Sequence, residues 1–230
     1  MPNDYFQFRC FTVHQERCAM KVGTDGTLLG AWARGGQSVL DIGTGTGLLA
    51  LMMAQRFPDS CVVGIDIDHG AVEQARENVA MSPFAERVSI IETDAKMYDA
   101  SQFDAIVCNP PYFIDSLKCP NEQRTLARHA SALTYGNLMV VARRLLTDKG
   151  ELSLVIPSDC KSRLEQEAIL TGFFKVRECA VRTTPRKLPR RYLLAFRKHS
   201  CELELSEGIV EMQPGIRSSW YQELTKDFYL

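Results

Sequence analysis

The sequence has no long hydrophobic run. None of its 230 residues belongs to a stretch of about 18 consecutive apolar residues, the length that a membrane-spanning helix requires. Its first ten residues are polar and aromatic, unlike the charged and then apolar start of a secretory signal. We therefore expect a cytoplasmic protein without a membrane partner.

Paired cysteine motifs are also lacking. The 8 cysteines stand singly, without a C-x-x-C pair and without the Cys/His spacing of a zinc site. This pattern argues against a disulfide scaffold and against a structural metal. We expect reduced thiols, most of them small core residues, and no metal site.

The net charge is only −1, and no repeat or low-complexity segment is visible. With 45% hydrophobic and 24% charged residues, the chain can form one sizeable core but is too short for two ordinary domains. The charge is unevenly distributed, because residues 161–198 hold 11 Lys or Arg against 3 Asp or Glu. Such a segment suits a polyanionic partner, but it is equally typical of a solvated face.

Short β-branched runs alternate with stretches of helical period. The pattern predicts strands at 38–43, 61–66, 88–94, 103–109 and 151–157, and helices near 48–56, 71–81, 133–146 and 161–171. This alternation predicts parallel strands joined by right-handed crossovers, with ligands bound beyond the carboxyl ends of the strands. Residues 173–183 and 191–198 have no helix between them and predict an antiparallel hairpin at the sheet edge.

The predicted fold class is α/β, a Rossmann-like doubly wound, mostly parallel seven-stranded sheet with an antiparallel C-terminal hairpin. We assign residues 1–198 to this domain, with 1–37 as a segment that covers the cofactor or substrate. Residues 199–230 are acidic and end in aromatics, and we expect them to form a peripheral helix or an ordered tail.

Three glycines at alternate positions follow the first predicted strand. Gly43, Gly45 and Gly47 would let the backbone approach a ligand and expose helix N-terminal amides to it. The spacing G-x-G-x-G differs from the G-x-G-x-x-G of dinucleotide enzymes, and Asp41 stands two residues before the first glycine. A carboxylate there would disfavour a pyrophosphate and suit a cationic amino-acid group. We therefore favour S-adenosylmethionine as ligand, bound by Asp41 and these glycines.

Acidic residues end the next two predicted strands. Asp66 is placed to accept hydrogen bonds from both ribose hydroxyls, and the alternative role of helix N-cap is better filled by Asp68. Asp94 would accept the exocyclic amine of the cofactor's adenine while the backbone of Ala95 reads the ring edge. The alternative for Asp94 is a simple turn, because Asp is common at strand ends.

The sequence Asn109-Pro-Pro-Tyr112 follows the fourth predicted strand. Two prolines fix the backbone, so the Asn109 amide and the Pro110 carbonyl point to fixed places. Both can accept the N–H groups of a conjugated amine, which favours the pyramidal nitrogen that attacks a sulfonium methyl group. Tyr112 offers a ring face on which a planar base can stack. We therefore predict Asn109, Pro110 and Tyr112 as catalytic residues, with Asn109 also touching the cofactor.

Together, the segment 39–47, Asp66, Asp94 and the Asn109 turn resemble the class I S-adenosylmethionine-dependent N-methyltransferases over roughly residues 20–198. The segments 20–32 and 123–133 resemble one bacterial family, the valine-tRNA adenine-37 N6-methyltransferases. This resemblance implies methyl transfer to N6 of the adenine beside the anticodon.

The same resemblance places Lys21, Gly23 and Thr24 beside the methionine end of the cofactor. A cap formed by Thr24 and Asp25 at the start of a helix is an equally good explanation of those two residues.

The implied partner is a tRNA anticodon loop, from which a base can leave its stack more easily than from a duplex. We expect a monomer that contacts this RNA through Tyr112, Arg124, Arg128, Arg186, Lys187, Arg190 and Arg191, mostly at phosphates.

Other functions stay open at this point. Guanine-N2 methylation of ribosomal RNA and glutamine-N5 methylation of a protein use similar turns. The release-factor glutamine N5-methyltransferases usually carry an N-terminal helical domain, for which about 37 residues before the first strand leave no room. A non-catalytic RNA-binding module and a nicotinamide-dependent oxidoreductase are further alternatives. The intact Asn109 turn disfavours the module, and the glycine spacing disfavours the oxidoreductase.

Overall fold

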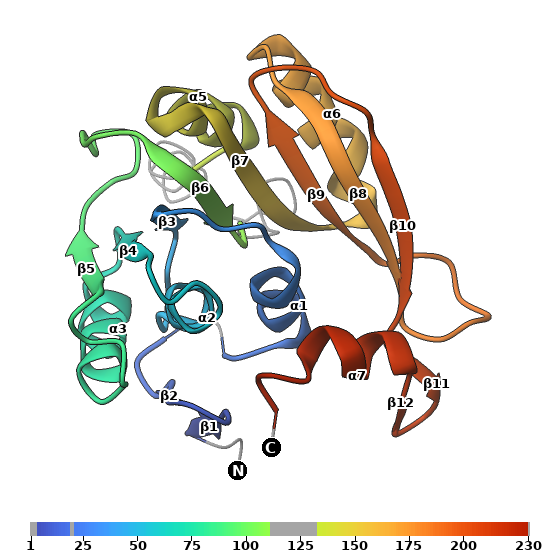
Figure 1. Ribbon diagram of the computed structural model, residues 1–230, viewed down its shortest axis with the longest axis horizontal. Coiled ribbons are helices and arrows are strands. Elements are labelled where there is room, and N and C mark those ends of the chain that lie inside the picture. The colour runs from blue at the N-terminus through green and yellow to red at the C-terminus, as the bar shows by residue number, and fades with distance from the viewer. Residues whose placement is uncertain (1–3, 19–20, 111–132, 230) are drawn as a thin grey trace, which may run out of the picture.

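The computed structural model describes residues 4–18, 21–110 and 133–229. Its strands are β1 (Tyr5–Gln7), β2 (Thr12–His14), β3 (Ser38–Ile42), β4 (Cys61–Asp66), β5 (Val88–Glu92), β6 (Phe103–Cys108), β7 (Leu146–Pro157), β8 (Phe174–Arg182), β9 (Arg191–Arg197), β10 (Glu204–Ile209), β11 (Glu211–Gln213) and β12 (Ile216–Arg217). Its helices are α1 (Thr24–Trp32), α2 (Leu48–Arg56), α3 (His69–Ala80), α5 (Tyr135–Leu145), α6 (Lys161–Leu170) and α7 (Ser219–Thr225), and a short 3-10 turn covers Ser158–Cys160 (Figure 1).

One large sheet organises the molecule, in the order β10-β8-β9-β7-β6-β3-β4-β5. The strands β5, β4, β3, β6 and β7 are parallel, and β9 runs antiparallel to both β7 and β8. The predicted α/β fold, with five parallel strands and an antiparallel C-terminal hairpin, is therefore confirmed. Among the described residues, no helix is long and apolar enough to cross a membrane.

The expected number of seven strands is wrong, because β10 adds an eighth. This strand comes from the segment expected to be a peripheral tail, and it pairs in parallel with β8, with Ser206 opposite Cys179. Its sequence, Glu-Leu-Ser-Glu-Gly-Ile, lacks a clear alternation of apolar and polar residues, and its first four residues are exposed. The carboxylates of Glu204 and Glu207 suit an edge strand, since charge discourages pairing with another chain.

Helices cover both faces of the sheet (Figure 1). One apolar cluster joins α1, α2 and α3 with the β1–β2 hairpin and α7, and includes Met52, Val72 and Phe228. The other joins α5 and α6 to the opposite face and includes Leu138 and Leu164. Because both faces of the central strands β3 and β6 are buried, those strands are near-continuous apolar runs in the sequence.

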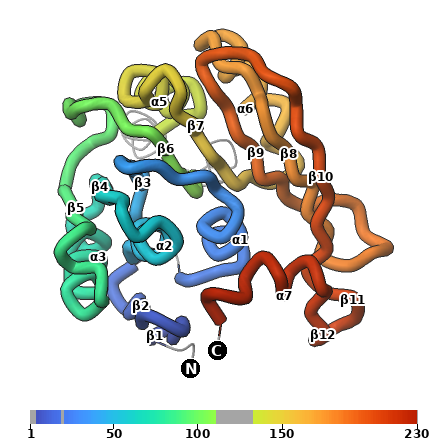
Figure 2. The backbone as a smooth tube through the Cα atoms, viewed as in Figure 1, coloured from blue at the N-terminus to red at the C-terminus, as the bar shows by residue number. Residues whose placement is uncertain are grey.

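The beginning and the end of the described chain pack against each other (Figure 2). The Arg9 amide donates to the Phe228 carbonyl at 2.8 Å, and the rings of Phe8 and Tyr229 stack with centroids 5.9 Å apart. Phe228 is only 1% exposed, so the tail contributes to the core. Neither the β1–β2 hairpin nor this packing was predicted, because three-residue strands carry too little periodic signal.

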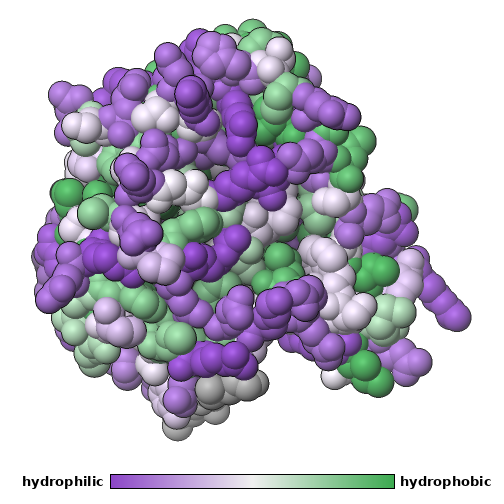
Figure 3. Space-filling view, in the orientation of Figure 1, coloured by the Kyte–Doolittle hydropathy of each residue, from purple (hydrophilic) through white to green (hydrophobic). Residues whose placement is uncertain are grey.

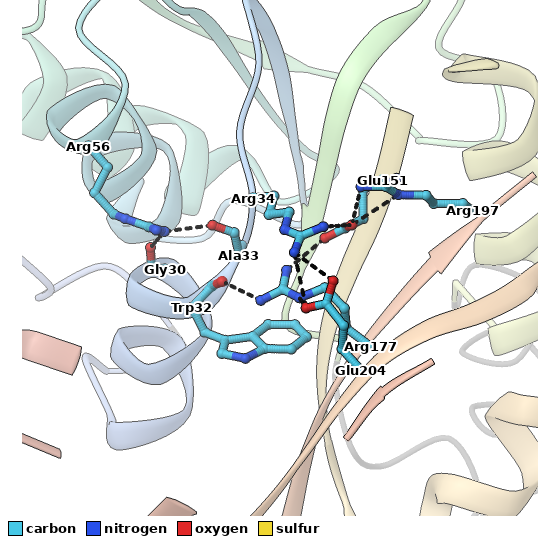
Figure 4. A network of polar contacts seen from close by, with 9 residues as sticks. All are labelled: Gly30, Trp32, Ala33, Arg34, Arg56, Glu151, Arg177, Arg197 and Glu204. Atoms are coloured by element: carbon cyan, nitrogen blue, oxygen red, sulfur yellow. Dashed lines mark hydrogen bonds and ion pairs between the residues drawn. The ribbon is translucent and has the colours of Figure 1, made fainter. Parts of the chain in front are cut away.

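A network of arginines and glutamates ties α1 to the antiparallel side of the sheet (Figure 4). The Glu151 carboxylate is 3% exposed and accepts from Arg177 at 2.8 Å and from Arg197 at 2.9 Å. Arg177 also donates to the backbone carbonyl of Trp32, and its guanidinium lies 3.9 Å from the centre of the Trp32 ring. Arg34 lies 3.7 Å from Glu151 and pairs with Glu204 of β10 at 2.8 Å. The end of α1 is thereby held against β7, β8, β9 and β10.

We expect Glu151→Gln to lower the free energy of unfolding by about 3 kcal/mol, because the mostly buried guanidinium of Arg177 loses its nearest negative charge and Arg197 loses its ion pair with Glu151. Urea denaturation monitored by circular dichroism measures this value. The matched control is Glu204→Gln in the same network. The Glu204 carboxylate is exposed, so water can take its place as a partner of Arg34, and the unfolding curve of this variant should stay close to that of the unmodified protein. Equal losses for the two variants would contradict the role given to the buried carboxylate.

Candidate functional site

A cavity of about 780 Å³ opens at the carboxyl ends of β3, β4, β5 and β6. It has the size of a small-molecule or cofactor site. Most of its walls come from the segment before and at the start of α1, the turn after β3, and the ends of β4, β5 and β6, and Ala71, Leu133 and Arg191 also line it. The predicted site residues on its walls are Lys21, Gly23, Thr24, Gly43, Gly45, Asp66, Asp94, Ala95, Asn109, Pro110 and Arg191.

The turn between β3 and α2 needs its glycines. Gly43, Gly45 and Gly47 have φ angles of 72°, 54° and 82°, in the left-handed region that side chains with a Cβ atom rarely adopt. The backbone amides of Gly43 and Thr44 donate to the Ile65 carbonyl, which anchors the turn to β4. Gly43 and Gly45 face the cavity, whereas Gly47 is the N-cap of α2 and packs against Ala75 of α3.

Asp41 lies behind the cavity wall. Its side chain is fully buried, and one carboxylate oxygen accepts from the Thr44 hydroxyl at 2.6 Å and from the Ala50 amide at 3.1 Å. Burial raises the pKa of this carboxyl from 3.8 to about 7. Asp41 therefore orients the glycine turn and the start of α2. The expected direct contact of Asp41 and Gly47 with a ligand is not seen in the geometry, because neither residue lines the cavity.

Asp66 connects two backbone segments at the end of β4. One oxygen accepts from the Gly45 amide at 2.9 Å, and the other accepts from the Asp68 amide at 3.0 Å. The Asp68 side chain caps α3 by accepting from the Ala71 amide at 2.8 Å, which confirms the N-cap role expected for it. Asp66 therefore does not serve as the cap of α3, and it lines the cavity.

Asp94 and Ala95 line the cavity next to the end of β5. One Asp94 oxygen accepts from the Lys96 amide at 2.9 Å, and the other lies 3.2 Å from the Lys96 ammonium group. The Asp94 carbonyl accepts from the amides of Met97 and Tyr98, so this residue also forms the turn considered as its alternative role. Its side chain is 28% exposed.

Asn109 and Pro110 follow β6 directly and line the same cavity. They lie at the carboxyl end of a strand between β3 and β7, where a doubly wound sheet places its ligands. Three further residues predicted at the site, Tyr112, Arg124 and Arg128, lie outside the described residues.

The start of α1 forms another part of the wall. Lys21, Gly23 and Thr24 line the cavity, and Gly23 is the N-cap of the helix. The expected cap by Thr24 and Asp25 is wrong, because both residues lie within the first turn and no side chain caps this helix end. Asp25 pairs instead with Arg191 of β9, at 2.8 Å.

Arg17 and Cys18 also line the cavity, and no sequence pattern indicates either of them as a site residue. The backbone there is held by α3: the Asn78 side chain accepts from the His14 amide and donates to the carbonyls of His14 and Thr46, all within 2.9 Å. Burial, with the nearby charges of two aspartates, raises the pKa of the Cys18 thiol to about 11. Cys18 is thus a neutral wall residue. No group of three or more possible metal ligands is found in the described part of the chain.

A turn rich in cations lies at the same edge of the sheet as the cavity. We call residues 183–190 the basic turn; it joins β8, which is parallel to β7, to the start of β9. Its cations Arg186, Lys187 and Arg190 are exposed, and none has an ion pair with another described residue. Figure 3 shows hydrophilic side chains projecting where Figure 1 places this turn. Arg191, by contrast, points to the cavity and is engaged by Asp25.

The raised pKa of Asp41 predicts a pH dependence of stability. The folded protein favours the neutral, protonated form of Asp41, because the folded-state pKa lies above the unfolded value. The stability that this form provides is fully present below about pH 4 and is lost as the pH rises towards 7. From pH 4 to pH 7 the free energy of unfolding should therefore fall relative to that of Asp41→Asn, by at most about 1.4 kcal/mol per pH unit. Urea denaturation across this range tests it, with Asp148→Asn as an exposed control. If the free energies of unfolding of the unmodified protein and of Asp41→Asn change with pH in parallel, the titration of Asp41 is not the cause.

Comparison with known proteins places this site in a family. Residues 26–185 match the family described as Methyltransferase small domain. The chain is 45% identical to the tRNA1(Val) (adenine(37)-N6)-methyltransferase of Bacteroides thetaiotaomicron, over 100% of this chain and 99% of that protein. The protein of the same name from Histophilus somni is 38% identical, over 98% and 97%.

Among solved structures, the chain resembles a predicted O-methyltransferase from Agrobacterium tumefaciens, with a TM-score of 0.69 at 16% identity over 89% of this chain and 96% of that one. At this identity the likeness shows a shared fold. The similarity over entire chains shows more: the protein belongs to the tRNA1(Val) (adenine(37)-N6)-methyltransferase family.

Proposed function

We propose that this protein transfers the methyl group of S-adenosylmethionine to N6 of adenine 37 in a valine tRNA. The observation that carries the proposal is the position of Asn109 and Pro110 on the wall of a ligand-sized cavity that also contains Asp66 and Asp94. Family membership supplies the reaction and the substrate, as named for the relatives.

The cavity can take the cofactor along its length. Asp66 would accept the ribose hydroxyls, and Asp94 with the Ala95 backbone would hold the adenine ring. The methionine end would then lie towards Lys21, Gly23 and Thr24, where the uncapped N-terminus of α1 offers amides to a carboxylate. Gly43 and Gly45 allow the backbone to pass close to the middle of the ligand.

The Asn109 turn would position the target nitrogen. The lone pair of adenine N6 is delocalised into the ring, so the amine is a poor nucleophile. If the Asn109 side-chain oxygen and the Pro110 carbonyl accept its two N–H groups, they favour a pyramidal nitrogen whose lone pair is aimed at the methyl carbon. The new bond forms between N6 and this carbon while the bond from carbon to sulfur breaks. The neutral thioether of S-adenosylhomocysteine leaves, and the extra proton on nitrogen passes to water.

The RNA would approach from the edge of the sheet that carries the basic turn. The cations Arg186, Lys187 and Arg190, which form no ion pair within the described part of the chain, suit phosphates, and the flipped adenine would enter the cavity beside Asn109. Contacts of Tyr112, Arg124 and Arg128 with the RNA belong to the same proposal, on the basis of the sequence alone. A single chain carries both the cavity and the basic turn, which supports action as a monomer.

Methyl transfer to different substrates tests this function. The protein is incubated with labelled S-adenosylmethionine and, separately, with unmodified total tRNA, ribosomal RNA or a protein fraction. Label in tRNA that nucleoside analysis identifies as N6-methyladenosine is the expected result. Label in N2-methylguanosine of ribosomal RNA, or in a protein amide, would replace the proposal by the corresponding alternative.

Asn109→Ala should lower kcat by a factor of about 10²–10³, because one preorganised acceptor of the reacting amine is lost. The Kd for S-adenosylmethionine, measured by calorimetry, should change less than kcat. Asn137→Ala, an exposed asparagine on α5, is the matched control and should leave both values unchanged. Full activity of Asn109→Ala would remove the catalytic assignment.

Neutralising the basic turn should weaken tRNA binding in a salt-dependent way. For each of Arg186→Ala, Lys187→Ala and Arg190→Ala, the slope of log K against log salt concentration should decrease by about 1. Filter binding across a salt series measures the slope. Lys149→Ala is the control, because this exposed residue lies near the amino end of β7, at the opposite edge of the sheet. An unchanged slope in all three turn variants would mean that the turn is only a solvated surface.

A further inference from the structure

Arg191 differs from the other cations near the basic turn. It is the first residue of β9 and pairs in register with Pro157 of β7 and Val181 of β8, so its backbone is fixed between two strands. Its side chain is 23% exposed and lines the cavity. The neighbouring Arg190 is exposed and has no ion pair among the described residues. Arg191 is thus part of the cavity wall, whereas Arg190 belongs to the outer surface.

The partner of Arg191 comes from a distant part of the sequence. Asp25, in the first turn of α1, is 25% exposed and places one carboxylate oxygen 2.8 Å from Arg191 Nε. This partly buried contact joins the N-terminal part of the chain to the hairpin of β8 and β9. Such a pair is screened less by salt than one on the outer surface.

The charge of Asp25 creates a difficulty for the proposed ligand. The first turn of α1 carries no side-chain cap, and its residues 23–26 line the cavity where the methionine carboxylate of the cofactor would bind. A negative side chain in that turn interacts favourably with the helix dipole, but it repels the methionine carboxylate of the cofactor if that group binds nearby. A cation held against Asp25 removes this repulsion and fixes the helix start on the wall.

We propose that Asp25 and Arg191 form a positioning pair for the cofactor, in which Arg191 neutralises Asp25 and holds the first turn of α1 in place. Arg191 therefore acts on the binding of S-adenosylmethionine through Asp25, and it does not contribute to tRNA affinity as the cations of the basic turn do. This inference rests on the proposed function, because it takes the cofactor as the occupant of the cavity.

A double-mutant cycle tests the pair. Calorimetry gives the Kd for S-adenosylmethionine of Asp25→Asn, Arg191→Gln and the double variant, and filter binding gives the Kd for a valine tRNA transcript with S-adenosylhomocysteine present. Arg191→Gln should raise the cofactor Kd about tenfold, because it removes the positive charge that is held against Asp25. Asp25→Asn should change it less than about threefold. The double variant should regain most of the affinity lost in Arg191→Gln, which a purely structural defect would not allow.

Two further variants make the result decisive. Arg191→Lys keeps the positive charge, so its Kd for S-adenosylmethionine should lie within about threefold of that of the unmodified protein. This variant still tests the inference if Arg191→Gln fails to fold. Arg190→Ala should affect tRNA binding but not cofactor binding. An unchanged cofactor Kd in Arg191→Gln, or no recovery in the double variant, would overturn the inference. A tenfold loss in Arg191→Lys would also overturn it. If the unmodified protein itself fails to bind S-adenosylmethionine, the proposed function fails instead.

Discussion

The common direction of the sheet strands is the constraint on which the site depends. Because β3, β4, β5, β6 and β7 are parallel, their carboxyl ends, and the turns that follow them, meet at one edge. Strand β9 is antiparallel to both β7 and β8, so β8 points in the same direction as β7 and also ends at this edge. The cavity and the basic turn therefore lie together, although more than 100 residues separate Gly43 from Arg190 in the sequence. Substrate and cofactor surfaces thus follow from topology.

A second set of interactions, outside the cavity, stabilises the turns at the carboxyl ends of the strands. Asp41 orients the glycine turn from a fully buried position, and Asn78 joins the N-terminal segment to the same turn. At the other end of α1, the network around Glu151 fixes the helix against the antiparallel strands (Figure 4). These groups do not need to touch a ligand to matter. Their buried hydrogen bonds hold the residues that face the cavity in one arrangement, as a preorganised site requires.

Much of this arrangement could be predicted from the sequence. The parallel core is visible there because buried strands are apolar runs, and the bounds of α2 and β4 were predicted to the residue. The family expected from the resemblance is confirmed by the full-length relatives, whereas the roles of the individual site residues stay predictions. The positions of Asp66, Asp94 and Asn109 on one cavity follow from their places at strand ends.

Other features had no local signal. The strand β10 is acidic and exposed, and the β1–β2 hairpin is too short for a periodic pattern. The pairing of Asp25 with Arg191 joins residues 166 positions apart, which propensity alone cannot reveal. Asp41 was assigned to the ligand because a carboxylate beside a glycine turn suits a cation. The sequence did not show that the Thr44 hydroxyl and the Ala50 amide would both donate to one oxygen of this carboxylate. Tertiary contacts, rather than local pattern, decide such cases.

The most direct test of the central claim uses two valine tRNA transcripts that differ only at position 37. One carries adenine at this position and the other carries guanine, and both are incubated with the protein and S-adenosylmethionine before nucleoside analysis. The account predicts close to one N6-methyladenosine per molecule in the first transcript and none in the second. Equal methylation of the two transcripts, or none in either while the protein binds S-adenosylmethionine, would contradict it.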